Sequence, residues 1–159
     1  MIKIVAAAFL LYPALVFAQT PPATCPNLNG DYKYSELVAN VTVDITQTAC
    51  STIEFNVTAD VLGSTYADDL TSPLDGVTRQ YKGPNANETD FGSAQFQGDT
   101  LVIIVERDVT GSNGQVTKST IEAKAVLKSA NVLEVTEGDL DSSGNMTNSK
   151  TFDLNRVSN

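Results

Sequence analysis

Two neighbouring segments in the C-terminal half of the chain share a pattern that restricts the fold. An apolar run, Leu101–Val105, is followed by a turn-rich segment over 110–114 and by a return segment, 116–127, with apolar residues on alternate positions. The same pattern recurs between Val132 and Leu154 around a second turn-rich segment, 141–145. Alternation with a period of two, bounded by turn residues, is typical of β-hairpins. The sequence therefore predicts two consecutive β-hairpins here.

Similar alternation occurs nearer the N-terminus, and helical spacing is hard to find. Val41, Val43 and Ile45 would face one way on a strand, and the segment 53–57 repeats this alternation. Between 59 and 91 the pattern weakens, but short strands are expected at 61–65 and 77–81. We predict an all-β fold: an antiparallel meander of about eight or nine strands that closes into a small β-barrel, with a β-sandwich as the alternative.

The first 18 residues have the features of an export signal. Lys3 precedes an apolar run, and Val16-Phe17-Ala18 places small or apolar residues at the cleavage position. Because the run is too short to span a membrane, we expect residues 1–18 to be a signal peptide cleaved near Ala18, and the chain to be secreted or periplasmic. Residues 19–29 are expected to be an extended lead-in, and 30–159 a single β-barrel domain.

The remaining residues are strongly acidic. Without the predicted signal peptide, 9 basic and 19 acidic side chains remain, which gives a net charge of −10. Nucleic acids and anionic membrane surfaces would repel such a charge. No later apolar stretch has the length of a membrane span. We therefore expect no nucleic-acid partner and no membrane insertion, and leave a protein partner open.

Cys25 and Cys50 are the two cysteines, and in an exported chain we expect them to form a disulfide. Their positions fit a hairpin that turns at Leu37 and Val38, because residue 25 then faces residue 50. A disulfide here would clip the open end of that hairpin. Closing a loop of this size stabilises a fold by about 3 kcal/mol.

The chain has no histidine. This excludes imidazole general bases, Ser-His-Asp and Cys-His arrangements, and zinc or copper sites with histidine ligands. A Ser–Lys dyad stays open, although no motif points to one. A carboxylate pair acting on glycosides also stays open, with Asp68, Asp69 and Asp75 as the available pool. Acidic residues in loops are more often solvated surface, and no constellation has catalytic geometry. The sequence therefore predicts a protein that is not an enzyme and that needs no cofactor.

One acidic turn has part of a calcium-binding pattern. Asp139, Asp141 and Ser143 supply oxygen atoms at alternate positions, and Gly144-Asn145 follows, with glycine in the sixth place where a calcium loop needs it. Lys150 occupies the twelfth position, where such a loop has a bidentate glutamate, and no helices flank it. An acidic hairpin turn is therefore the preferred interpretation, with calcium as the weaker alternative.

The two ends of the barrel segment carry a family resemblance. Gly30-Asp31-Tyr32 at the first strand, the meander of short strands and a terminal Phe152-x-Leu154-x-Arg156 together resemble a lipocalin-type (calycin) barrel. In that family a Gly-x-Trp motif begins strand one, and an arginine from the last strand packs across the aromatic ring. The resemblance implies that Tyr32, in the tryptophan's place, and Arg156 form a barrel-closing pair worth about 0.5–2 kcal/mol.

The segment from Cys25 to Tyr32 also resembles the start of avidin-type barrels. Because the chain has no tryptophan, the residues that line a biotin pocket are missing and biotin binding is not implied.

Two functions follow from these features. The first is binding of a small apolar or amphipathic ligand inside a lipocalin-like barrel, since a barrel of this size can leave a cavity. The second is a non-enzymatic secreted or surface interaction or structural domain with a filled core. The inward positions carry mainly Val, Ile, Leu and Ala, which suit either one. An interior pocket of about 300 Å³ or more would favour the ligand.

Overall fold

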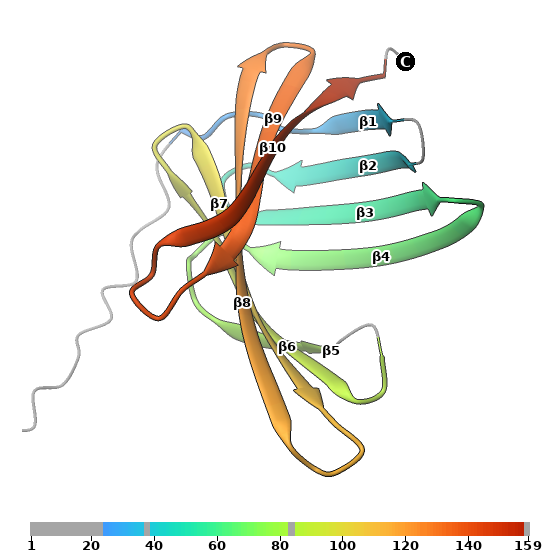
Figure 1. Ribbon diagram of the computed structural model, residues 1–159. Coiled ribbons are helices and arrows are strands. Elements are labelled where there is room, and N and C mark those ends of the chain that lie inside the picture. Colours follow the sequence, from blue (N-terminus) through green and yellow to red (C-terminus); the bar gives the residue numbers. More distant parts are fainter. Residues whose placement is uncertain (1–23, 37–38, 83–84, 158–159) are drawn as a thin grey trace, which may run out of the picture.

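The computed structural model describes residues 24–36, 39–82 and 85–157, and these form ten β-strands and no helix (Figure 1). The predicted signal peptide, 1–18, and positions 19–23 of the lead-in lie outside the described residues. The strands are β1 (Gly30–Glu36), β2 (Ala39–Thr48), β3 (Thr52–Val61), β4 (Ser64–Pro73), β5 (Arg79–Lys82), β6 (Glu88–Gln97), β7 (Thr100–Thr110), β8 (Val116–Ser129), β9 (Val132–Leu140) and β10 (Met146–Arg156).

The ten strands form one continuous antiparallel sheet that curls into a half-barrel. The order across the sheet is β4-β3-β2-β1-β10-β9-β8-β7-β6-β5. Consecutive strands are therefore neighbours, except for β4 and β5 at the two edges, and the first strand pairs with the last. Figure 1 shows β1–β4 side by side as one wall, with β7–β10 crossing them as the other. The curled sheet is open between β4 and β5, which form its two edges. The predicted all-β meander with a barrel-like closure is confirmed, and a single sheet replaces the sandwich alternative.

The strand count and one strand position differ from the sequence prediction. The structure has ten strands, and the short strand expected at 61–65 is wrong. The chain instead turns there at Leu62 and Gly63, which have φ of 51° and 83°. The first half of β4 is exposed. Because an edge strand with a solvated surface does not need alternating apolar residues, its sequence gives little periodic signal.

The lead-in and the first hairpin are held together as the cysteine positions predicted. Glu36 pairs with Ala39 across the turn, and the Cys25–Cys50 disulfide joins the far end. The buried Gln47 amide binds the same segment: its oxygen accepts from the Leu28 backbone N–H at 3.0 Å. Its nitrogen donates to the carbonyl oxygens of Pro26 at 3.1 Å and of Ala49 at 2.7 Å. These contacts hold Leu28 in the core, where it is fully buried.

The densely packed core lies at one end of the half-barrel. The largest fully buried side chains include Leu28, Tyr32, Ile53, Leu74 and Leu101. They come from the lead-in, from strands on both walls and from the loop between β4 and β5, so this end of the curled sheet is plugged. Burying an apolar side chain of this size contributes about 1.5–3 kcal/mol. The plugged end therefore anchors both walls.

Removal of the disulfide should destabilise the fold measurably. We expect a Cys25→Ser, Cys50→Ser variant to lose about 3 kcal/mol in free energy of unfolding, because the unfolded chain gains freedom. Urea denaturation followed by circular dichroism measures this. Reducing agent should lower the stability of the wild-type protein and leave the variant unchanged. Equal unfolding midpoints for the variant and the oxidised wild-type protein would contradict the prediction.

Candidate ligand-binding hollow

The curled sheet encloses a half-open space of about 800 Å³ between its two walls, called the hollow below. One wall consists of β1, β2 and β3, and the other of β7, β8, β9 and β10. Most of the lining is apolar. The lining residues are Tyr34, Val41, Val43, Ile45, Phe55, Val57, Ile103, Ala123, Ala125, Leu133, Val135, Glu137, Lys150, Thr151, Phe152 and Leu154.

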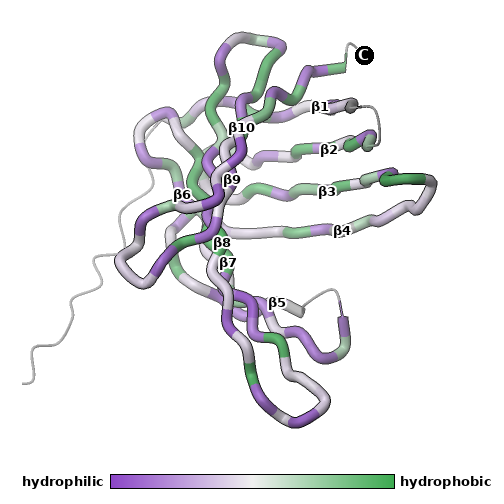
Figure 2. Tube along the Cα trace, viewed as in Figure 1, coloured by the Kyte–Doolittle hydropathy of each residue, from purple (hydrophilic) through white to green (hydrophobic). Residues whose placement is uncertain are grey.

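The hollow exists because small side chains occupy the inward positions away from the plugged end. Hydrophobic and hydrophilic stretches follow one another along several strands in Figure 2. Because successive side chains of a strand point to opposite faces, every second one points inward. The lining includes the short side chains of Val41, Val57, Ala123 and Val135. The protein has no tryptophan to fill the gap. Alternation thus gives an apolar interior, and the size of its residues leaves space in it.

Aromatic rings form part of the lining. Tyr34 on β1 and Phe152 on β10 lie with their ring centroids 5.3 Å apart at an interplanar angle of 51°. Phe55 lines the hollow from β3. Tilted ring pairs of this kind contribute about 0.5–1.5 kcal/mol beyond the area they bury. The rings are also flat apolar surfaces that a ligand can contact.

Two charged residues stand at the mouth of the hollow. Glu137 on β9 and Lys150 on β10 are Cα partners in the sheet, both line the hollow, and both are exposed. Next to them the ladder contains a bulge between Thr147 and Lys150. Bulges bend a strand and increase its twist locally. The hollow therefore combines an apolar interior with a mouth that carries one acidic and one basic group.

The bulge depends on a glycine in the neighbouring strand. A Cβ atom on Gly138 would lie 2.6 Å from Cγ of Met146 and 2.7 Å from the Thr147 carbonyl oxygen. Asn148, within the bulge, has a φ of 50°. Because only a residue without a side chain lets the bulged backbone approach this closely, Gly138 shapes the mouth.

Polar side chains line the interior of the sheet near the gap between the edge strands β4 and β5. Arg107 on β7 donates to both oxygens of Asp90 on β6, at 2.9 and 2.8 Å. The Tyr81 hydroxyl on β5 donates to the Ser72 hydroxyl on β4 at 3.2 Å, which links the two edge strands. A smaller cavity of about 130 Å³ lies among these side chains and shares Ile103 with the hollow. The Tyr81–Ser72 bond therefore crosses the gap between β4 and β5 that the backbone ladder leaves open.

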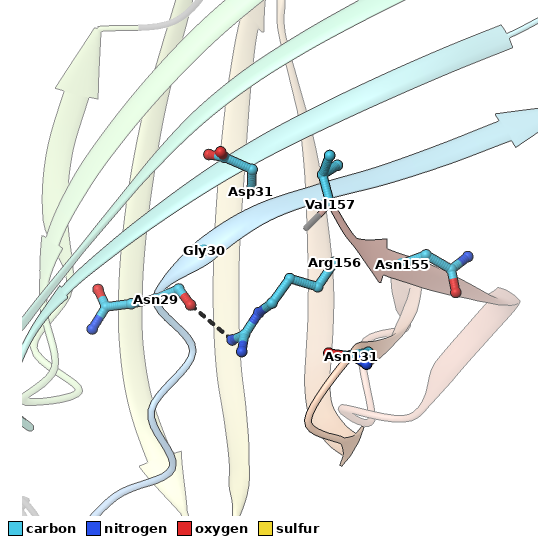
Figure 3. A pocket seen from close by; sticks show the side chains of 7 residues that line it. All are labelled: Asn29, Gly30, Asp31, Asn131, Asn155, Arg156 and Val157. Carbon is cyan, nitrogen blue, oxygen red and sulfur yellow. Dashed lines mark hydrogen bonds between the residues drawn. The ribbon is translucent and has the colours of Figure 1, made fainter. Parts of the chain in front are cut away.

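The structure brings Tyr32 and Arg156 together at the seam between β1 and β10. They are Cα partners, and the guanidinium carbon lies 5.1 Å from the Tyr32 ring centroid. One guanidinium nitrogen donates to the Tyr32 hydroxyl at 2.6 Å and to the Asn29 carbonyl oxygen at 2.7 Å, the second bond being the dashed line in Figure 3. The Tyr32 hydroxyl in turn donates to the Leu28 carbonyl oxygen at 3.0 Å. The pair therefore connects the last strand, through Arg156, with Leu28 and Asn29 of the lead-in.

A polar cleft of about 380 Å³ lies beside this seam and is drawn in Figure 3. Its charged lining groups are Asp31 and Arg156, and Arg156 is held by the fold through the bonds above. Gly30 is part of the same arrangement: a Cβ atom there would lie 2.8 Å from Nε of Arg156. The cleft therefore results from the way the seam is built, and we assign it no ligand.

The acidic turn between β9 and β10 uses its oxygen atoms internally. Oδ1 of Asp141 accepts from the backbone N–H groups of Asn145 at 2.9 Å and Ser143 at 2.8 Å, and these bonds lower the pKa of the Asp141 carboxyl. The Asp139 carboxylate accepts instead from the Asn148 amide at 3.1 Å. In the part of the chain that the structure describes, no three acidic, histidine or cysteine side chains form a metal-binding group.

The three aspartates considered for glycoside chemistry lie in different settings. Asp69 is an exposed residue of β4, Asp75 lies in the loop after that strand, and the side chain of Asp68 is outside the described set. Asp75 accepts two bonds from Arg79, at 2.8 and 2.6 Å, and one from the Val77 backbone at 3.0 Å. These bonds, chiefly those from Arg79, lower the pKa of Asp75 from 3.8 to about 2. Asp75 thus acts as a loop anchor.

Sequence reasoning missed the polar residues of the interior. Lys150 was considered only as the missing calcium ligand, although alternation from Leu154 and Phe152 places it on the inward face. Asp90 and Arg107 are Cα partners on the neighbouring strands β6 and β7. The turn at 98–99 sets this register, but neither residue was singled out from the sequence.

Comparison with protein-family models, with curated proteins and with solved structures gave no match. Among the described residues, no helix is long and apolar enough to cross a membrane.

The seam pair should show energetic coupling. We expect Tyr32→Phe, which removes only the hydroxyl, and Arg156→Met each to lower the free energy of unfolding. The double variant should lose less than the sum of the two, with a coupling of about 1 kcal/mol or more, because a charged hydrogen bond is shared. Urea denaturation of the four proteins measures it. Lys33→Met, on the outer surface of β1, is the control, and additive losses at the seam would contradict the prediction.

The Asp75 contact should give a pH-dependent contribution to stability. Because the folded protein holds the pKa of Asp75 near 2 instead of 3.8, the contact stabilises the fold fully above pH 3.8 and is lost as the pH falls through 2. We expect Asp75→Asn to be less stable than the wild-type protein near neutral pH, with the difference shrinking on acidification toward pH 2. Thermal unfolding across this range measures it. A difference that does not change with pH would exclude this role.

Proposed function

We propose that this chain is an exported, lipocalin-like barrel that binds a small apolar or amphipathic ligand in the hollow. The observation that carries the proposal is an apolar interior space of about 800 Å³ between the two walls. Ligand sites generally occupy about 300–1,000 Å³, are mainly apolar and contain a few polar groups. The hollow has this size, this lining and a polar mouth.

Burial energetics support the same function. Apolar surface gains roughly 25 cal/mol for each Å² that is removed from water. Val41, Val57 and Phe152 line a space that an apolar ligand can fill, so binding would bury protein and ligand surface together. The alternative, an interaction or structural domain with a filled core, gives this space no role. We therefore favour binding over a purely structural function.

Two further features belong to the proposal. The Cys25–Cys50 disulfide suits an oxidising compartment, which supports export. The protein has no histidine, and the Asp75 carboxylate is engaged with Arg79, which supports binding without catalysis. The acidic net charge supports a ligand over a nucleic acid as the partner.

A neutral apolar dye tests the proposal. N-phenyl-1-naphthylamine should bind the oxidised protein saturably at one site, with increased fluorescence because the dye leaves water. Ala123→Phe places a ring in the hollow, and we expect it to weaken binding about tenfold or more, equivalent to at least about 1.4 kcal/mol. Fluorescence titration of the two proteins gives the dissociation constants.

The matched control is Ala67→Phe, which adds the same ring at an exposed position of β4. It should bind the dye as the wild-type protein does. Circular dichroism and urea denaturation establish that both variants are folded. Absence of saturable binding to the wild-type protein, or equal binding by the folded Ala123→Phe variant, would overturn the proposal.

A further inference from the structure

We infer that the ligand of the hollow is an amphiphile with an acidic head group, which Lys150 binds at the mouth while the apolar part lies between the walls. This inference rests on the proposed function and narrows its ligand class. It depends on three observations: the position of Lys150 at the hollow, the lack of an ion pair between Lys150 and any described carboxylate, and the bulge in β10 next to it.

Lys150 projects from the lining of an apolar space. From Leu154 through Phe152 the residues of β10 alternate inward in an unbroken register with β9, and Lys150 is the next inward position. Among the described residues that line the hollow, it is the only basic one. A lysine stem packs along apolar surface while its ammonium remains in water. This placement suits contact with the polar end of a ligand whose remainder is buried.

Among the described residues, no carboxylate forms an ion pair with the Lys150 ammonium, whereas most of the other described cations have such a partner. Lys118, Lys124 and Lys128 each lie within 3.1 Å of a carboxylate oxygen. Lys150 faces Glu137 across the ladder, yet no ion pair within 4.0 Å joins it to any described residue. An acidic ligand group could therefore reach it without first breaking an ion pair.

The bulge fixes the place of Lys150. It lies directly beyond Lys150 on β10, where Asn148 has a φ of 50° and Gly138 allows close packing of the two backbones. Bulges recur beside binding sites, where they redirect side chains or end a regular ladder. Here the regular inward register ends at Lys150, so the lysine marks the boundary between the apolar interior and the mouth.

Glu137 gives the inference a sharp test, because it should act in the opposite direction. Its carboxylate lies at the mouth beside Lys150 and would repel an acidic head group. Neutralising Lys150 should therefore weaken binding of an acidic amphiphile, whereas neutralising Glu137 should strengthen it. A neutral amphiphile of the same length should respond little to either change.

The experiment is competition against N-phenyl-1-naphthylamine with four ten-carbon probes: decanoate, decyl sulfate, decanol and decyltrimethylammonium. We expect the two acids to bind more tightly than decanol, and Lys150→Gln to weaken the acids about threefold to fivefold, as exposed ion pairs allow. Glu137→Gln should tighten the acids by a similar factor. Both acid effects should diminish at high salt because the charges are exposed. Decanoate and decyl sulfate separate a carboxylate preference from a sulfate preference.

Lys33→Gln is the matched control. Lys33 is an exposed lysine on the outer surface of β1, so its removal changes the net charge equally without touching the mouth. It should leave all four affinities unchanged. Two results would show that the head-group inference is wrong while the hollow still binds apolar molecules. In the first, the dye binds but the two acids bind no more tightly than decanol. In the second, Lys150→Gln changes the affinities for decanoate and decanol equally. If the dye itself does not bind, the proposed function has failed.

Discussion

The pairing of the first strand with the last is the contact on which the rest of the structure depends. Among the described residues, two Cα pairs form the ladder between β1 and β10: Tyr32 with Arg156 and Lys33 with Asn155. Arg156 reinforces this short ladder by lying over the Tyr32 ring and bonding to its hydroxyl. Without this seam the backbone ladder would divide into two sheets, β1–β4 and β5–β10, and the two walls of the hollow would not be joined.

The interior combines two packing regimes along one sheet. At one end large side chains such as Tyr32 and Leu28 fill the space and bind the lead-in. Toward the other end valines and alanines line both walls and leave the space that we assign to a ligand. A protein selected for stability alone would gain from larger residues there, since unfilled space forfeits contacts. Small residues at inward positions therefore lower stability, which the proposed ligand binding would explain.

Much of the fold follows from local patterns in the sequence. Alternating residues and turn chemistry predicted the antiparallel meander, and the midpoint of the first hairpin predicted the Cys25–Cys50 bond. The edge strand β4 was not predicted, because its exposed surface does not require apolar residues at alternate positions. The sequence left open whether the interior is hollow or filled, because that depends on the register and curvature of all ten strands together. Lys150 was visible in the sequence, but its position at the mouth depends on the bulge and Gly138.

The central claim is that an apolar ligand occupies the hollow, and methyl NMR with N-phenyl-1-naphthylamine tests it most directly. The account predicts chemical-shift changes and dye contacts at the methyl groups of Val41, Val57 and Val135, which line the hollow. It predicts none at Val77 and Val116, which are exposed to 41% and 53% elsewhere. Shifts confined to the exposed valines, or spread evenly over all five, would contradict the account.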